Sequence, residues 1–213
     1  MSVIERLLRR DVDAGTDVIG DITLEPMHRR DLRRGVMAIE TVSYPRTWSQ
    51  GVFESELAQV RSGTRRYLVA RRAAAAAATA ATNPPDRGRG RSRSRGRGVG
   101  YAGLWLNGDD APVTNVAVQL EHQRCGVATA LLLALADAAI ARGCAGWTLE
   151  VRVSSTGAQE LYRRFRFDPA GVRARYYENT EDAIVMWCND IQGDEYRALL
   201  DSIRADAERR GSS

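Results

Sequence analysis

The chain has 213 residues, of which 44% are hydrophobic, and its net charge is +4, with arginine supplying all 31 basic residues. This length fits one domain with appendages or at most two small domains, and the lack of lysine excludes a lysine Schiff base and a lysine-bearing phosphate loop. Three cysteines without a CxxC pair and two histidines without ligand spacing predict neither a disulfide framework nor a metal site.

Apolar periodicity divides the first part of the chain into strands and helices, behind an N-terminal extension assigned to residues 1–20. The expected elements are a strand at Ile22–Glu25, a helix at Arg29–Ser43, a second helix at Gly51–Val60 and a strand at Tyr67–Ala70.

An abrupt change of composition then defines an insertion, residues 73–98. It begins with a run of alanine and continues with prolines and with arginine that alternates with glycine or serine. Because this segment has no large apolar side chain, it cannot contribute to a core and we expect it to be disordered. It would form an Arg/Gly/Ser-rich loop between two neighbouring strands, where a hairpin turn would otherwise stand.

The second part of the chain continues the alternation. The expected elements are a strand at Val99–Leu106, a turn at Gly108–Pro112, a strand at Val113–Val118, a helix at Thr129–Arg142 that stops at Gly143, a strand at Thr148–Val153, a short helix at Gly157–Phe165, a strand at Ala183–Trp187 and an amphipathic helix at Asp194–Arg210. This order indicates an α/β (α+β) domain over residues 21–192, followed by a C-terminal helix over 193–213. No signal-type or membrane-spanning apolar run is present, so a soluble cytoplasmic protein is expected.

The segment from Gln123 to Ala128, QRCGVA, lies between an expected strand and an expected helix. A helix N-terminus offers unpaired N–H groups and the positive end of the helix dipole, which together bind phosphates. Small residues at Gly126 and Ala128 would let a ligand approach the backbone, and Arg124 would add charge. The same pattern also fits a plain tight turn. It is neither the three-glycine dinucleotide fingerprint nor the lysine-containing Walker loop.

This loop resembles the Q/R-x-x-G-x-G/A loop of the GNAT acetyltransferases, in which it holds the pyrophosphate of acetyl-CoA. The resemblance covers about residues 22–191 without the insertion, and it is strongest to the bacterial ribosomal-protein-alanine N-acetyltransferases (RimI). The other stretches that carry it are Ile39-Glu40, Pro45–Trp48, Val113–Val118, Thr148–Arg152, Leu161-Tyr162, Tyr176–Asn179 and Glu181–Ala183. It implies the GNAT fold, a mixed central sheet flanked by helices, with acetyl-CoA as co-substrate and no metal.

The resemblance also implies which residues contact acetyl-CoA. They are Val116, Ala117, Val118, Gln123, Arg124, Cys125, Gly126, Val127, Ala128, Thr129, Ser155 and Tyr162. A backbone N–H near Ala117 or Val118 is the implied donor to the oxyanion of the tetrahedral intermediate. We interpret Cys125 as a small filler, because no His–Asp pattern accompanies it to support a nucleophilic mechanism.

Glu150 and Tyr162 are the expected general base and general acid for direct transfer to an amine. In LEVRV apolar and charged residues alternate, so Glu150 points away from the apolar face, and a charged face on a central strand suggests a cleft. A solvent-facing glutamate paired with an arginine explains the same pattern. Tyr162 shares a face with Leu161 and Phe165, as a core aromatic would. The resemblance favours the base role for Glu150 and places Tyr162 near the sulfur of CoA.

The peptide substrate is expected in an acidic and aromatic region. The residues that the resemblance assigns to it are Glu40, Tyr176, Tyr177, Glu178 and Glu181, and the implied substrate is the N-terminal alanine of a small-subunit ribosomal protein. Carboxylates there would suit a protonated amine and a basic peptide tail. Ordinary surface charge and core tyrosines are the alternative for each residue.

Two positions depart from the family pattern. Ser155 stands where the family usually has asparagine, and Arg166 stands where it has glycine before Phe167.

Two other functions stay open. A GNAT enzyme that acetylates another protein N-terminus or a small amine would share the loop and the fold. In another class, the chain would be an RNA- or ribosome-binding protein that acts through arginines between residues 87 and 97, although no aromatic residue is interleaved with them.

Overall fold

A computed structural model describes residues 16–72 and 96–211 of the protein, and a single eight-stranded sheet forms its centre. The strands are β1 (Asp17–Ile19), β2 (Ile22–Pro26), β3 (Arg65–Arg72), β4 (Gly100–Trp105), β5 (Asp110–Val118), β6 (Gly146–Arg152), β7 (Asp168–Tyr177) and β8 (Glu181–Cys188). Their order in the sheet is β1-β2-β3-β4-β5-β6-β8-β7, and every neighbouring pair is antiparallel except β5 and β6.

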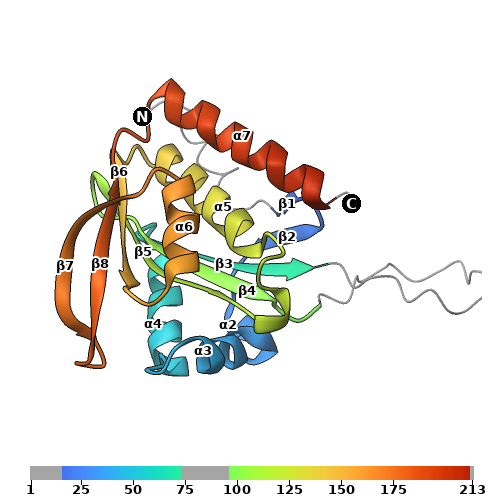
Figure 1. The fold of residues 1–213 in the computed structure, drawn as a ribbon. Helices are drawn as coiled ribbons and strands as arrows, with labels where there is room; N and C mark the ends of the chain where they lie inside the picture. The colour runs from blue at the N-terminus through green and yellow to red at the C-terminus, as the bar shows by residue number, and fades with distance from the viewer. Residues whose placement is uncertain (1–15, 73–95, 212–213) are drawn as a thin grey trace, which may run out of the picture.

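The helices lie in two groups, one on each face of the sheet (Figure 1). They are α2 (Arg29–Asp31), the π-helical η1 (Leu32–Val36), α3 (Met37–Ser43), α4 (Gln50–Val60), the 3-10 turn η2 (Leu120–His122), α5 (Val127–Ala141), α6 (Thr156–Arg164) and α7 (Asp194–Gly211). The helices from α2 to α4 pack on one face through Leu32, Ile39 and Phe53. The helices α5, α6 and α7 cover the other face. The predicted mixed sheet flanked by helices is therefore confirmed.

The helix α5 is the central element of the second face. Its sequence, VATALLLALADAAIA, is apolar almost all round, and a helix of that composition must be buried on every side. The sheet covers one side of α5 and α7 covers the other. An ion pair of 2.8 Å between Arg204 of α7 and Asp137 of α5 ties the two helices together. This packing fixes the start of α5 directly beyond the end of β5.

The predicted helix Arg29–Ser43 is interrupted in the structure. Arg34 and Gly35 have non-helical backbone angles, with φ of 142° at Gly35. The N–H of Gly98 donates to the Arg34 carbonyl at 3.2 Å, and a Cβ at Gly35 would lie 2.8 Å from the Gly98 carbonyl oxygen. Glycine is required both by the backbone angle and by this close approach. The kink depends on a contact with a distant segment, which periodicity within the helix does not reveal.

Two strands were not predicted, and one predicted turn is too long. β1 lies within the segment assigned to the N-terminal extension and pairs with β2. β7 has exposed side chains along almost its whole length, so it lacks the alternation that indicates a half-buried strand. The predicted turn Gly108–Pro112 is closed earlier, by a bridge between Asn107 and Asp110, and Pro112 lies inside β5.

The predicted insertion begins and ends at adjacent strands. β3 and β4 are antiparallel neighbours, with Ala70 opposite Gly100, which confirms its position between two neighbouring strands. Residues 73–95 lie outside the described part of the chain, as do residues 1–15 and 212–213. The expected disorder of the insertion and most of the expected RNA contact at residues 87–97 therefore fall outside it too. Among the described helices, none combines the length and the apolar character needed to cross a membrane.

Candidate active site

A cleft opens where the two parallel strands at the centre of the sheet separate. β5 and β6 are paired only from Asp110 opposite Gly146 to Pro112 opposite Thr148. Just beyond this point the β4–β5 register shifts and leaves Thr114 without a partner, and a bulge of this kind bends its strand. The cleft has a volume of about 620 Å³ and is lined by β5, β6, the end of α3, the start of α6 and the end of β7.

The edge of β5 that faces the cleft supplies backbone groups. The N–H of Gln119 donates to Val99 on the β4 side at 2.9 Å. Because backbone directions alternate along a strand, Ala117 also faces β4, whereas Val116 and Val118 face the cleft. The Tyr44 hydroxyl donates to the Val116 carbonyl at 2.9 Å, and the Gln123 side chain donates to the Val118 carbonyl at 3.3 Å. Both carbonyls are thus occupied, and the N–H groups of Val116 and Val118 are directed into the cleft.

Glu40 lines the same cleft but is only 2% exposed. One of its carboxylate oxygens accepts the Trp48 N–H at 2.6 Å, and the other accepts the hydroxyl of Tyr101. Burial, together with the charge of Glu40, raises the pKa of Tyr101 above its ordinary value, so this hydroxyl remains a donor. Glu40 therefore anchors the segment Pro45–Trp48 at the wall of the cleft.

Glu150 lies on β6 and faces the cleft, as the alternation in LEVRV indicates. Its carboxylate is 3.2 Å from the guanidinium of Arg173 on β7, and its side chain is 28% exposed. Its backbone carbonyl accepts the hydroxyl of Tyr177 at 3.0 Å. Glu150 therefore shows both features considered from the sequence: it lies in the cleft, and it pairs with an arginine as a solvent-facing glutamate would. The carboxylate is accessible to a ligand that enters between the strands.

Tyr162 lies across the cleft on α6. Its ring packs against Phe167 with 5.9 Å between ring centroids, so it is a core contact as well as a cleft residue. Burial raises the pKa of Tyr162 to about 12, so the phenol stays protonated at neutral pH. Within the described residues its hydroxyl makes no hydrogen bond. Tyr162 can therefore donate a proton to a ligand in the cleft.

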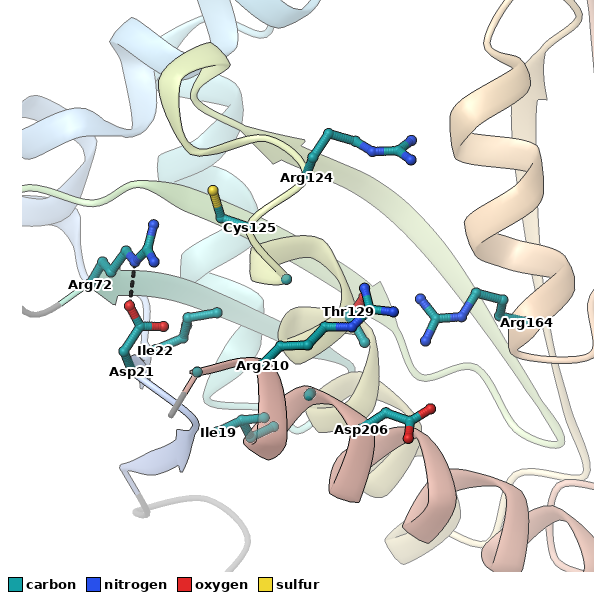
Figure 2. Close-up of a pocket in the computed structure, with 13 residues that line it drawn as sticks. Ile19, Asp21, Ile22, Arg72, Arg124, Cys125, Thr129, Arg164, Asp206 and Arg210 are labelled. Carbon is teal, nitrogen blue, oxygen red and sulfur yellow. Dashed lines mark hydrogen bonds and ion pairs between the residues drawn. The ribbon is translucent and has the colours of Figure 1, made fainter. Parts of the chain in front are cut away.

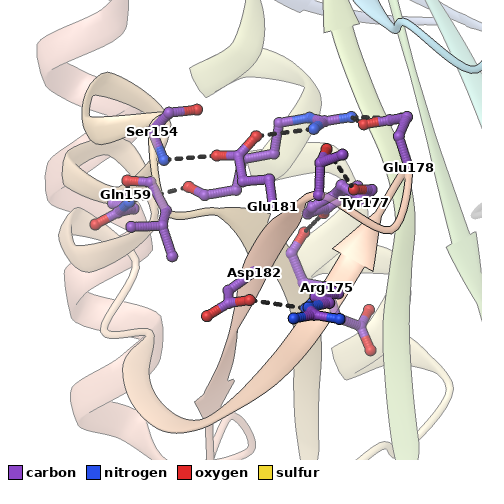
Figure 3. A network of polar contacts seen from close by, with 11 residues as sticks. Ser154, Gln159, Arg175, Tyr177, Glu178, Glu181 and Asp182 are labelled. Atoms are coloured by element: carbon purple, nitrogen blue, oxygen red, sulfur yellow. Dashed lines mark hydrogen bonds and ion pairs between the residues drawn. The ribbon is translucent and has the colours of Figure 1, made fainter.

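Arg152, on β6, organises the mouth of the cleft through contacts with three residues of the β7–β8 hairpin. Figure 3 shows these three residues, Tyr177, Glu178 and Glu181. The Arg152 guanidinium donates to Glu178 at 2.7 Å and to Glu181 at 2.9 Å, and it lies 4.1 Å from the centre of the Tyr177 ring. Hydrogen bonds from Ser154 and then from Arg152 lower the pKa of Glu181 to about 2. Glu178 and Glu181 are thus both paired with Arg152.

The tandem tyrosines differ in exposure. Tyr176 is 48% exposed at the cleft mouth, and its ring lies 5.1 Å from that of the less exposed Tyr177. The three-residue loop that follows has positive φ at both Glu178 and Asn179, and the Thr180 N–H donates to the Tyr177 carbonyl at 3.0 Å. The hairpin thereby presents Tyr176 and Tyr177 at the entrance on one side of Glu150.

The predicted phosphate loop leads directly into α5. Gly126 has φ of 84° and is the residue before the first helical turn, and Arg124 also has a positive φ, of 61°. The first N–H groups of a helix have no partner within it, and here they belong to Val127, Ala128 and Thr129. The loop residue Cys125 is exposed. This arrangement provides a set of backbone donors with a positive dipole end, suited to a phosphate group.

Two residues of the site were not found from the sequence. Tyr44 adjoins the stretch Pro45–Trp48 that carries the resemblance, but its bond to Val116 spans 72 positions of the chain and leaves no local signal. Arg173 lies in β7, a strand that was itself not predicted. Across residues 16–72 and 96–211, no group of three or more histidine, cysteine, aspartate or glutamate side chains could hold a metal ion.

A sheet that splays at a parallel pair, with a phosphate-type loop at the adjoining helix, is the architecture of an acyl-CoA-dependent transferase. The sequence profile of the acetyltransferase (GNAT) family matches residues 33–167, and the chain belongs to this family.

Proteins similar to this chain include one sequence relative and two solved structures. The chain is 43% identical over 81 residues to the ribosomal protein bS18-alanine N-acetyltransferase of Escherichia coli (strain K12), a stretch that covers 37% of this chain and 55% of the relative. The crystal structure of the ribosomal-protein-S18-alanine N-acetyltransferase from Escherichia coli matches 79% of this chain and 94% of that chain, with a TM-score of 0.62 and 26% identity. Ard1 from Thermoplasma volcanium shares the fold, with a TM-score of 0.63 and 18% identity over 79% of this chain and 97% of that chain.

Proposed function

We propose that this protein transfers the acetyl group of acetyl-CoA to the α-amine of a protein N-terminus, with the N-terminal alanine of a small-subunit ribosomal protein as its substrate. The observation that carries the proposal is the cleft between β5 and β6, which brings together a free backbone edge, the carboxylate of Glu150 and the phenol of Tyr162. The likeness to a relative named for bS18 alanine acetylation supports the choice of substrate. Such a substrate would be met in the cytoplasm.

The donors of the cleft fit acetyl-CoA. Its pyrophosphate would bind the N–H groups at the start of α5, where Gly126 lets it approach the backbone. Its pantetheine arm carries amide groups and would lie along β5, between the separated strands. The thioester oxygen would then meet the N–H of Val118. The sequence leaves Ala117 and Val118 as alternative donors, and the structure favours Val118 because Ala117 faces β4.

The chemistry follows from the positions of three groups. Glu150 accepts a proton from the substrate ammonium, and the neutral amine attacks the thioester carbonyl carbon. The N–H of Val118 stabilises the negative charge that develops on the carbonyl oxygen. As the carbon–sulfur bond breaks, Tyr162 donates its proton to the departing sulfur. The amine loses a second proton as the amide forms, and that proton restores Tyr162 through solvent. Glu150 releases its proton to solvent, so one proton is produced per turnover.

The substrate amine would enter beside the β7–β8 hairpin. Glu178 and Glu181 are held at 2.7 and 2.9 Å by the largely buried Arg152, whereas Glu150 has a longer contact of 3.2 Å with the exposed Arg173. Glu150 is therefore the carboxylate on this wall best placed to meet an ammonium group. Tyr176 and Tyr177 would pack against the first residues of the peptide. A small first side chain is favoured by this arrangement, because the two rings stand at the entrance.

A competition assay read by mass spectrometry tests the proposal. Purified protein and acetyl-CoA would be incubated with a peptide that begins with alanine, with the same peptide blocked at its α-amine but carrying a lysine, and with spermidine. We expect acetylation of the free α-amine alone. Exclusive acetylation of lysine or of spermidine would contradict the proposed substrate class and favour a small-amine enzyme of the same family.

A further inference from the structure

A second cavity lies beside the α5 loop, outside the cleft, and its lining is basic (Figure 2). It has a volume of about 170 Å³ and lies among the β1–β2 turn, the end of β3, the start of α5 and the C-terminal ends of α6 and α7. The charged residues that line it are Arg72, Arg124, Arg164, Arg210, Asp21 and Asp206. The arginines exceed the aspartates by two, so the cavity carries a surplus of positive charge.

Three of these arginines are not neutralised. Arg72 forms an ion pair with Asp21, and Asp206 forms one with Arg209, a neighbour that does not line the cavity. Within the described part of the chain, the side chains of Arg124, Arg164 and Arg210 have neither a carboxylate nor a hydrogen-bond partner. Guanidinium groups that face one cavity from three elements repel one another, and an anion between them would remove that repulsion.

Thr129 provides a second, independent observation. It is only 8% exposed and lines the cavity, yet its hydroxyl has no hydrogen-bond partner among the described residues. The hydroxyl oxygen itself is not fully buried, so it is open to the cavity and available to a ligand. In Figure 2 the Arg210 side chain reaches from α7 toward Thr129, and Arg164 approaches from α6 on the other side. The hydroxyl and the two guanidiniums converge on the same space.

We propose that this cavity binds the 3′-phosphate of CoA, the monoester on its ribose, through Arg164, Arg210 and the Thr129 hydroxyl. The inference rests on the proposed use of acetyl-CoA. The cavity begins at the loop itself, since Cys125 and Gly126 line it, while Gln123 of the same loop lines the cleft. A pyrophosphate bound at the start of α5 would therefore place the nucleotide half of CoA at this cavity. Guanidinium groups suit a phosphate dianion because they offer paired donors with a fixed charge.

The C-terminal helix makes this site possible. Gly20 and Gly211 pack so closely that a Cβ at Gly211 would lie 2.7 Å from the Cα of Gly20, which fixes the end of α7 against the β1–β2 turn. Because Arg210 directly precedes Gly211, the contact between the two glycines also fixes the position of Arg210. α7 lies outside residues 33–167, the part that the family profile matches. In this chain the helix thus completes the cofactor site in addition to covering α5.

Calorimetry with CoA and with 3′-dephospho-CoA tests the inference without requiring turnover. The wild-type protein should bind CoA about three- to tenfold more tightly than 3′-dephospho-CoA, a range set by charge-assisted bonds at a solvent-exposed site. Arg210→Gln and Arg164→Gln should each remove most of this preference, because they weaken CoA binding and leave 3′-dephospho-CoA binding unchanged. The matched controls are Arg197→Gln on α7 and Arg163→Gln on α6, arginines of the same two helices that neither line the cavity nor pair with a carboxylate that does.

Several results would overturn the inference. Equal affinity of the wild type for the two ligands would exclude a site for the 3′-phosphate. An equal loss of affinity for both ligands in Arg210→Gln, or an equal effect of Arg197→Gln, would show that the positive charge of the whole surface attracts CoA and that the cavity is not a specific site. If CoA binds with the expected preference but no alanine peptide is acetylated, only the proposed substrate fails. If CoA does not bind at all, both proposals fail.

Discussion

The two arms of the sheet, β1 to β5 on one side of the cleft and β6, β8 and β7 on the other, contribute in different ways. The first arm is covered by helices on both faces and presents backbone groups of β5, whose carbonyls are held by Tyr44 and Gln123. The second arm presents side chains, among them Glu150 and Arg152, and its outer strand β7 is exposed. Backbone donors persist through most substitutions, whereas side chains do not. Mutations on the second arm should therefore have the larger effects on chemistry.

The largest effect is expected for Glu150→Gln, which removes the proposed base and keeps the side chain's size. Turnover should fall by roughly 10²–10⁴, as is typical for loss of general acid–base catalysis, with the affinity for acetyl-CoA unchanged. Steady-state kinetics with an alanine peptide would measure it, with the exposed Glu160→Gln on α6 as the control. Turnover at the wild-type rate in Glu150→Gln would remove Glu150 from the mechanism.

Tyr162→Phe should have the next largest effect, a loss of turnover of roughly tenfold to a hundredfold. The ring contact with Phe167 is kept, so the thermal unfolding temperature should change little. Burial raises the pKa of Tyr162 to about 12, so its phenol remains protonated well above neutral pH. The free energy of unfolding should fall only as pH rises above the ordinary value of 10.0, where the phenol ionises more readily in the unfolded chain than in the folded one. A variant that unfolds more readily but turns over normally would make Tyr162 a core residue only.

Ser155→Asn should tighten acetyl-CoA binding by roughly two- to tenfold, the value of one added hydrogen bond. Ser155 lines the cleft at the start of α6, and its side chain makes no capping hydrogen bond, so the substitution removes none. Ser154→Asn, at the preceding exposed position outside the cleft lining, is the control for calorimetry. Unchanged binding by Ser155→Asn would place the pantetheine arm away from this wall, and weaker binding would contradict the predicted added hydrogen bond.

The smallest effect is expected for Arg166→Gly, which lies between α6 and β7. Arg166 has φ of 59°, a strained angle for any residue with a Cβ, and its ion pair with Glu195 is long and exposed, at 3.5 Å. The free energy of unfolding should rise by about 0.5–1 kcal/mol in a urea titration, while turnover stays unchanged. Arg163→Gly, one turn earlier within the helix, should instead lower it by about 1 kcal/mol. A drop in turnover for Arg166→Gly would link this turn to the chemistry of the second arm.

The sequence was informative where a pattern is local. The helices α5 and α7 have strong periodicity and were predicted within two residues at either end. Glu150 and Tyr162 were found because motifs mark them, and both do line the cleft; their roles stay predictions. The direction of the Val116 and Val118 backbone could not be found, since it depends on the β4–β5 register. The arginine cavity could not be found either, because its residues come from segments far apart in the chain.

The β3–β4 junction has a practical consequence for engineering. The chain leaves the sheet after Arg72 and returns before Gly100, yet Ala70 lies opposite Gly100 and the Val99 N–H donates to the Ala70 carbonyl at 2.8 Å. Arg71 additionally bonds the carbonyl of Gly96, so the point of return is held from within the domain. A foreign domain with closely spaced termini, such as a fluorescent protein, could be spliced in here without displacing either strand. The protein would then carry its own optical label at the end of the β3–β4 pair.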